Sequence, residues 1–264
     1  MAGRVEEYLK KRIREEGAIL MTLIDPEKVS KKSANFVAEQ SELYGSSAIM
    51  VGGSTFVASS HLDAVVKTIK KSVNIPVILF PNNITGVSRY ADAIWFMSLL
   101  NSSDAYFISG AQVLAAPLVK KFGLEAIPLG YLIVGDGGAA GVIGKATPIP
   151  YNKPELAVAH ALAAQYLGMR FVYLEAGSGA QYPVPPKMVR LVRETVDIQI
   201  VVGGGIRTKV QAKETVEAGS DIIVASTVFE DAERDLVKMK VNEIMEGIKE
   251  GLKNRYKQST GERL

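Results

Sequence analysis

The sequence alternates short apolar runs with longer segments of mixed polarity, and this alternation constrains the fold more than any other feature. Eight runs have strand length, at 18–25, 47–53, 75–81, 93–101, 126–135, 171–177, 198–205 and 221–226. They are apolar almost without interruption, which is typical of strands buried on both faces of a parallel sheet. Segments with helical patterning lie between them, at 28–44, 61–72, 154–167, 186–195, 209–218 and 233–249.

Eight β-then-α units in about 250 residues predict an α/β fold of the (β/α)8 TIM barrel type. An open, doubly wound sheet produces the same alternation, so this alternative remains. No linker rich in Pro or Ser divides the chain, and we expect a single domain over residues 1–264. The longest irregular stretch, at 134–154, is rich in Gly and is a candidate active-site lid.

Composition and charge exclude several classes of function. The 264 residues include no Cys, which rules out disulfide and thiolate chemistry and fits a cytoplasmic protein. No run reaches the roughly 18 apolar residues of a membrane span, and the charged start of the chain is unlike a signal peptide. The net charge of +3, without basic clusters, argues against nucleic-acid binding and leaves only peripheral contact with anionic membranes.

Glycines and small hydroxyl residues follow the last two predicted strands. Gly203, Gly204 and Gly205 end the seventh run, and Ser226 and Thr227 end the eighth. In a barrel the active site forms at the carboxyl ends of the strands, and these two loops often bind phosphate through unobstructed backbone N–H groups. We therefore expect a phosphate site there, although glycines also serve simply to make tight turns.

A carboxylate and hydroxyl groups end the first two runs. Asp25 follows the first, and Ser54 and Thr55 follow the second. Mg²⁺ takes one or two protein carboxylates and fills its other positions with water and substrate phosphate oxygens. Asp25 and Ser54 therefore predict a Mg²⁺ site beside the phosphate loops, and with it a second phosphorylated substrate. Alternatively, Asp25 caps the turn into the next helix, helped by Pro26.

Other candidate residues carry weaker signals. Arg207 either neutralises phosphate or begins the solvated face of the next helix. His61 and His160 belong to no metal-ligand cluster, so we interpret them as surface or helix-face residues. Three aromatic residues suit either the core or an apolar ligand channel: Trp95, Phe96 and Tyr106.

Four motifs, taken in order, carry a family resemblance. They are LIDPEK (23–28), VGGST (51–55), YLEAGSGA (173–180) and VGGGIRT (202–208). Together they resemble the geranylgeranylglyceryl phosphate synthases, with similarity from about residue 18 to about residue 245 and features of the family's larger subgroup. The resemblance implies a homo-oligomer, dimeric or hexameric, that performs Mg²⁺-dependent prenyl transfer. The C3 hydroxyl of sn-glycerol 1-phosphate would attack C1 of geranylgeranyl diphosphate to form the first ether linkage of archaeal-type membrane lipids.

The resemblance also implies roles for individual residues. Asp25 and Ser54 match the Mg²⁺ positions, while the positions of Lys28 and Arg207 leave their contact with substrate open. The positions that match the glycerol phosphate site are Tyr173, Leu174, Glu175, Ala176, Gly177, Ser178, Gly179, Gly204, Gly205, Ser226 and Thr227. Within that segment Glu175 stands at the end of a strand with almost bare backbone behind it. We expect Glu175 to be the general base that takes the hydroxyl proton.

Three other functions remain compatible with these motifs. The same reaction with a longer prenyl diphosphate, such as heptaprenyl diphosphate, is one, because the wall of the prenyl site follows no strict pattern. A barrel of the indole or imidazole pathways would share the phosphate loops but predicts catalytic Lys or Asp residues at strand ends. A non-catalytic binder of phosphorylated ligands would not need an acid–hydroxyl pair together with Glu175.

Overall fold

The computed structural model describes residues 2–53, 58–226 and 234–260, in which eight parallel strands form a closed barrel. The strands are β1 (Ile19–Ile24), β2 (Ser46–Val51), β3 (Val77–Leu79), β4 (Ala93–Leu99), β5 (Glu125–Ile133), β6 (Phe171–Glu175), β7 (Gln199–Gly203) and β8 (Ile222–Ala225). Each strand pairs with its neighbour in chain order, and β8 closes the ring on β1. The TIM-barrel prediction is confirmed, and the open sheet is excluded.

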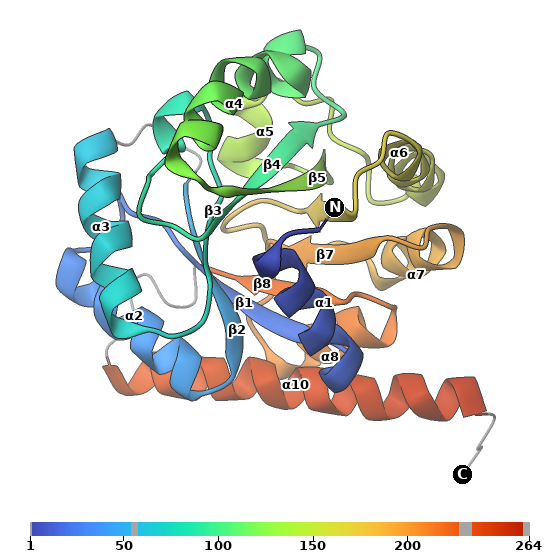
Figure 1. Cartoon of the computed structure of the whole chain (residues 1–264). Helices are drawn as coiled ribbons and strands as arrows, with labels where there is room; N and C mark the ends of the chain where they lie inside the picture. Colours follow the sequence, from blue (N-terminus) through green and yellow to red (C-terminus); the bar gives the residue numbers. More distant parts are fainter. Residues whose placement is uncertain (1, 54–57, 227–233, 261–264) are drawn as a thin grey trace.

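Helices surround this barrel (Figure 1). They are α1 (Arg4–Glu16), α2 (Lys31–Leu43), α3 (Ser59–Ser72), α4 (Ala111–Phe122), α5 (Gly138–Ile143), α6 (Pro154–Tyr166), α7 (Pro186–Thr195), α8 (Lys209–Glu217) and α10 (Arg234–Thr260). Two short turns complete the set, the 3-10 turn η1 (Ile84–Gly86) and the π-helical turn η2 (Tyr106–Gly110). The sequence patterns did not predict η2 or α4, and α5 lies inside the stretch expected to be irregular.

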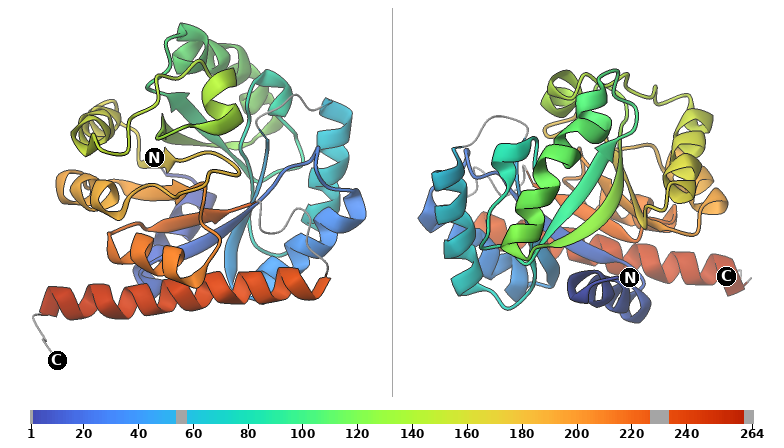
Figure 2. Two further views of the ribbon diagram at one scale, coloured as in Figure 1. Left: turned by 180° about the vertical axis from the view of Figure 1, so that it is seen from behind. Right: turned by 45° about the horizontal axis from the view of Figure 1, so that its top comes forward.

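The long helix α10 runs along one side of the barrel, where it packs against α8 and α2 (Figure 2). It extends beyond the predicted end at residue 249. None of the helices among the described residues combines the length and the apolar character that crossing a bilayer would require.

The third connection departs from the expected β-then-α pattern. Residues 80–92, all of which the structure describes, contain η1 and form no α-helix between β3 and β4. A parallel crossover usually needs a dozen or more residues, most of them in a helix, and this short segment contains both Pro81 and Gly86. The third crossover therefore adds no helix to the outer layer, and α3 and α4 pack against β3 and β4 on either side of it.

Strand side chains alternate between the barrel interior and the layer under the helices. On β6, Phe171 and Tyr173 belong to the interior cluster, whereas Val172 and Leu174 belong to the outer one. Glu175 follows in the inward phase and reaches the pocket at the carboxyl ends of the strands. The alternation of side chains along each strand therefore decides which residue at the strand end can contact a ligand in the pocket.

Helix α1 closes the opposite end of the barrel. Its Leu9 is fully buried in the interior cluster. The Glu125 carboxylate at the start of β5 accepts the N–H groups of Val5 and Glu6 at 2.7 and 2.8 Å, which caps the helix. Burial acts to raise the pKa of Glu6, but hydrogen bonds from Arg170 and Lys10 outweigh it and lower that pKa.

Truncating α1's central apolar contact should reduce stability without affecting the pocket. Leu9→Ala is expected to lower the free energy of unfolding by about 2–5 kcal/mol, because it leaves a cavity in a packed interior. Urea denaturation measures this loss. Lys11→Ala, on the solvent side of the same helix with 65% of its side chain exposed, is the control and should change stability by less than about 0.5 kcal/mol. Equal losses in the two variants would contradict the packing role of α1.

Candidate functional site

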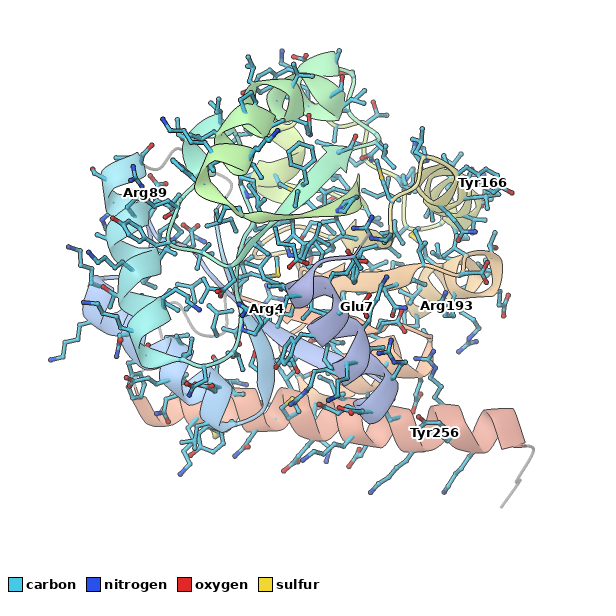
Figure 3. The ribbon with its side chains drawn as sticks, in the orientation of Figure 1. Arg4, Glu7, Arg89, Tyr166, Arg193 and Tyr256 are labelled. Carbon is cyan, nitrogen blue, oxygen red and sulfur yellow. The ribbon has the colours of Figure 1, made fainter. Side chains whose placement is uncertain are left out.

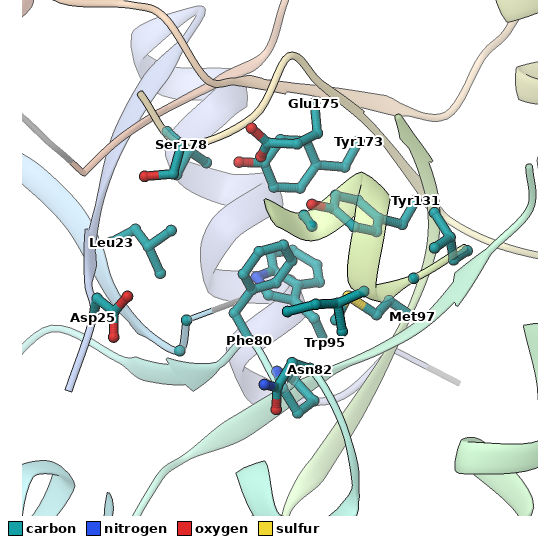
Figure 4. A pocket seen from close by; sticks show the side chains of 18 of the residues that line it. Leu23, Asp25, Phe80, Asn82, Trp95, Met97, Tyr131, Tyr173, Glu175 and Ser178 are labelled. Carbon is teal, nitrogen blue, oxygen red and sulfur yellow. The ribbon is translucent and has the colours of Figure 1, made fainter. Parts of the chain in front are cut away.

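A pocket opens at the carboxyl ends of the strands and has a polar part and an apolar part (Figure 4). Its polar side chains include Asp25, Lys28, Asn82, Asn83, Gln112, Glu175, Ser178, Arg207 and Ser226, with backbone contributed by Gly52, Gly53, Gly204 and Gly205. Segments that are up to 200 residues apart in the sequence therefore meet on one rim, as the barrel fold requires.

Glu175 is the most deeply buried carboxylate on this rim, with 5% of its surface exposed. Its Oε1 atom accepts the backbone N–H of Gly177 at 2.6 Å, and the Tyr173 hydroxyl also donates to its carboxylate. Burial raises the pKa of Glu175 above its ordinary value, and these two hydrogen bonds oppose that rise. A buried carboxylate of raised basicity beside a pocket is suited to accept a proton from a ligand.

The glycines after β7 make room for these β6 side chains. A Cβ atom on Gly203 would lie 2.1 Å from the Tyr173 hydroxyl, and one on Gly204 would lie 2.5 Å from Glu175 Oε1. Gly204 also has a φ of +79°, which side-chain-bearing residues rarely adopt. The glycines therefore have two roles. They leave backbone N–H groups accessible to an anion, and they leave space for the side chains of Tyr173 and Glu175.

Asp25 faces the pocket from the end of β1 and is 6% exposed. Its Oδ1 atom accepts the Glu27 N–H at 3.0 Å, and Lys28 Nζ lies 4.0 Å from its Oδ2. Helix α2 has its own N-cap, because the Ser30 hydroxyl accepts the Ser33 N–H at 3.1 Å. Asp25 therefore stabilises the local turn but does not cap the helix, and its carboxylate still lines the pocket.

Asp25 is the described residue at the mouths of β1 and β2 whose oxygen atoms could bind a hard cation. A Cβ atom on Gly53 would lie 2.5 Å from Asp25 Oδ1, so the chain after β2 passes directly beside this carboxylate. Ser54, the second predicted Mg²⁺ position, lies outside the described residues, as does Thr227. The described residues hold no group of three or more His, Cys, Asp or Glu side chains arranged for a metal. One carboxylate, completed by substrate phosphate oxygens, fits Mg²⁺.

The predicted glycerol phosphate residues divide between the pocket and the core. Those that line the pocket are Tyr173, Glu175, Ser178, Gly204, Gly205 and Ser226, together with Lys28 and Arg207. Leu174 and Ala176 instead point outward and are fully buried in the outer cluster. Gly177 and Gly179 are absent from the lining, but the Gly177 N–H holds Glu175.

The remaining predicted residues also find clear positions. His61 Nε2 lies within hydrogen-bond distance, 2.7 Å, of the Pro26 carbonyl oxygen, and His160 Nδ1 lies equally close to the Leu156 carbonyl oxygen of its own helix, α6. Neither histidine lines the pocket. Trp95 and Phe96 do line it, whereas Tyr106 packs its ring against Phe107. The candidate lid contributes α5, and the residues of this segment that line the pocket are Ala139, Ala140, Ile143 and Gly144.

The apolar part of the pocket lies between β4 and α4. Ile94 and Phe96, which face outward from β4, line it together with Val87, Phe107 and Ala115. The sequence patterns left Phe96 open between the core and an apolar ligand channel, and they missed the part of this wall that α4 forms because they did not predict that helix. Phe80 was missed as well, although it continues the inward phase of β3 two residues after Ile78. The result is an apolar channel that leads away from the polar rim.

Comparison with known proteins shows that this chain is similar to one family of proteins over most of its length. The PcrB family matches residues 11–248. Geranylgeranylglyceryl phosphate synthase of Thermofilum pendens is 49% identical over 258 residues, covering 98% of this chain and 100% of the relative. The synthase of Thermococcus gammatolerans is 52% identical over 248 residues, covering 94% of this chain and 98% of the relative.

A solved structure shares both the fold and much of the sequence. It is the crystal structure of (S)-3-O-geranylgeranylglyceryl phosphate synthase from Thermoplasma acidophilum in complex with its substrate sn-glycerol-1-phosphate. The superposition has a TM-score of 0.89 at 41% identity and covers 95% of this chain and 100% of that chain.

The burial of Glu175 makes stability depend on pH in a specific direction. The pKa of the Glu175 carboxyl group is higher in the folded than in the unfolded chain. The folded protein therefore loses stability as the pH rises above about 4.5, the ordinary pKa of this group. Glu175→Gln removes the charge, so this variant should match the wild type at low pH and become more stable as Glu175 ionises. Each 1 kcal/mol gained would raise Tm by about 2–4 °C.

Thermal unfolding between pH 4 and pH 8 measures this difference. Glu155→Gln, with 63% of its side chain exposed on α6, is the matched control and should leave the pH profile unchanged. A Glu175→Gln protein that is less stable than the wild type at neutral pH would contradict burial as the dominant influence on Glu175.

Proposed function

The chain belongs to the PcrB family, and from this premise we infer that its pocket forms an ether bond between two phosphorylated substrates. It is a prenyltransferase: the C3 hydroxyl of sn-glycerol 1-phosphate attacks C1 of geranylgeranyl diphosphate, and diphosphate leaves. The observation that carries this proposal is the position of Glu175, at the meeting point of the glycine-lined rim and the apolar channel. A small polar substrate and a long apolar one would meet at that carboxylate.

The glycerol phosphate fits the side of the rim formed by β6, β7 and β8. Gly204 and Gly205 present backbone there, and Ser178 and Ser226 present hydroxyl groups. Arg207 lines the same side and supplies positive charge for the phosphate. This placement puts the glycerol hydroxyls next to the Glu175 carboxylate.

Glu175 acts as the general base in this proposal. An alcohol is a poor nucleophile, and proton transfer to a positioned base contributes about 10² to 10⁴ in rate. The hydrogen bonds from the Gly177 N–H and the Tyr173 hydroxyl hold the carboxylate in place, so it need not reorganise during the reaction. Its pKa, raised by burial, strengthens it as a base.

Mg²⁺ is the proposed cofactor, held by Asp25 and by Ser54. When held there, the ion would supply positive charge that offsets the negative charge of the diphosphate group. Asp25 fits this role because its carboxylate is buried at the rim, is oriented by the Glu27 N–H and lies directly beside the chain after β2. Lys28 lines the pocket close to Asp25 and adds positive charge on the same side.

The apolar channel would take the prenyl chain. It begins at Phe80, passes Met97 and Phe107, and continues between β4 and α4. Burial of such a chain contributes about 25 cal/mol for each Å² removed from water, which favours a long hydrocarbon over a short one. A longer prenyl diphosphate, such as heptaprenyl diphosphate, is the alternative substrate for the same chemistry.

We also propose that the protein is cytoplasmic and assembles into a homo-oligomer, dimeric or hexameric. The absence of Cys suits a reducing compartment. Exposed apolar side chains on α6 and directly after it suit a contact between copies, because Leu156, Tyr166 and Leu167 are 44%, 78% and 68% exposed. Figure 3 shows Tyr166 at the outer edge of the molecule.

Product analysis tests the proposed reaction directly. Purified protein, sn-glycerol 1-phosphate, Mg²⁺ and an equimolar mixture of C15, C20 and C35 prenyl diphosphates should give mainly the C20 ether by mass spectrometry. EDTA should abolish the product, and added Mg²⁺ should restore it. A dominant C35 ether would identify the longer-chain alternative. Tight binding of both substrates without any ether would support the non-catalytic interpretation instead.

Replacing the base should separate binding from turnover. Glu175→Gln is expected to bind sn-glycerol 1-phosphate within about threefold of the wild type and to lose about 10² to 10⁴ in kcat. The wild-type kcat should fall as the pH drops through the raised pKa of Glu175, because the base must be ionised, and the variant should lack this acid limb. Calorimetry and initial rates measure the two effects, with Glu155→Gln as control. A variant with near-wild-type kcat would remove Glu175 from the mechanism.

A further inference from the structure

Three aromatic rings form the floor of the pocket, and Phe80 contacts the other two. Its ring centroid lies 5.5 Å from that of Tyr173 in a stacked arrangement and 5.4 Å from that of Tyr131 in an edge-on arrangement. The two tyrosine rings are themselves 5.4 Å apart, and all three residues line the pocket. We call Phe80, Tyr131 and Tyr173 the aromatic floor; Figure 4 shows them together.

Phe80 lies between the side of the pocket that holds Asp25 and the side that holds Glu175. The backbone that follows β2 passes close to both residues, because a Cβ on Gly52 would lie 1.9 Å from the Phe80 carbonyl oxygen and one on Gly53 would lie 2.5 Å from Asp25 Oδ1. On its other side Phe80 stacks on Tyr173, which donates a hydrogen bond to Glu175. Figure 4 shows Phe80 near the centre of the pocket, with Asp25 and Glu175 on different sides of it.

The proposed reaction places positive charge at this point. As the C1–O bond of geranylgeranyl diphosphate breaks, its electron pair leaves with diphosphate and the allylic carbons C1 to C3 become electron-poor. The glycerol C3 oxygen then bonds to C1, and its proton passes to Glu175. With diphosphate on the Asp25 side, the hydroxyl on the Glu175 side and the channel beginning at Phe80, the allylic carbons lie against the Phe80 ring.

An aromatic ring suits this charge better than the other groups in the pocket. The ring quadrupole attracts a cation, yet the ring does not compete as a nucleophile as an additional carboxylate would. Phe80 is also the most exposed member of the aromatic floor, at 8%, compared with 6% for Tyr131 and 1% for Tyr173. The Tyr173 hydroxyl is already engaged by Glu175.

We propose that Phe80 is a further catalytic residue, whose ring stabilises the positive charge that develops on the allylic carbons of the prenyl substrate. This inference rests on the proposed function. A cation–π interaction of ordinary strength corresponds to about a 3- to 30-fold effect on the rate of the chemical step. That effect belongs to kcat, because the charge exists only in the transition state.

Graded fluorination of the Phe80 ring tests this proposal. Fluorine withdraws electron density from the ring face while changing its size very little, so the protein should keep its fold. Replacing Phe80 with 4-fluoro-, 3,5-difluoro- and 3,4,5-trifluorophenylalanine should lower the single-turnover rate stepwise, by about 10-fold in total. KM for sn-glycerol 1-phosphate should stay unchanged.

Phe171 provides the matched control. It is fully buried in the same barrel interior, packs edge-on against Trp95 at 5.1 Å and does not line the pocket. The same fluorinated series at Phe171 should give a flat rate profile. Wild-type protein should also turn over 2-fluorogeranylgeranyl diphosphate much more slowly than the natural substrate, because fluorine at C2 destabilises allylic positive charge.

Each outcome decides the question. A stepwise fall at Phe80 with a flat series at Phe171 supports the assignment. Equal rates across the Phe80 series, in a protein that still makes the ether, would overturn it and leave the proposed function intact. An undiminished rate with the 2-fluoro substrate would also overturn it, because no cation would then form. Wild-type protein that makes no ether at all would overturn the proposed function together with this inference.

Discussion

The buried carboxylate of Glu175 is the feature on which the rest of the site depends. Removing an ionised group from water is costly unless hydrogen bonds compensate, and here the Gly177 N–H and the Tyr173 hydroxyl provide them. Those bonds require close packing of β6 against β7, which only Gly203 and Gly204 permit. The burial that raises the pKa of Glu175 destabilises its ionised form, and the same packing directs the carboxylate into the pocket. The cost in stability and the suitability for proton transfer therefore have one cause.

The connection between β3 and β4 departs from a regular barrel, and an apolar channel lies near it in the same pocket as Glu175. A regular (β/α)8 barrel would cover β3 and β4 with a helix from the third crossover, and the segment at 80–92 is without one. The outward side chains Ile94 and Phe96 pack in the outer core and also line the apolar channel between β4 and α4. A polar rim and an apolar channel meet beside the aromatic floor, which is the combination that a diphosphate with a long hydrocarbon tail needs.

The sequence predicted the architecture well because burial on both faces makes parallel strands nearly continuous apolar runs. It also located Asp25, Glu175, Ser178 and Ser226 on one rim, since strand ends in a barrel converge. It did not show which residues of a motif turn their side chains toward the pocket: the side chains of Leu174 and Ala176 point into the outer core. It left Phe96 open between the core and an apolar channel, and it did not predict α4 or the lack of a helix between β3 and β4.

The most direct test of this account is a crystal structure with sn-glycerol 1-phosphate and an unreactive thiolo analogue of geranylgeranyl diphosphate bound together. The account predicts the glycerol C3 oxygen at about 2.6–3.2 Å from a Glu175 carboxylate oxygen. It also predicts the allylic carbons over Phe80 and the hydrocarbon tail between β4 and α4. A glycerol C3 hydroxyl bound away from Glu175, or a tail that leaves the barrel by another route, would contradict it.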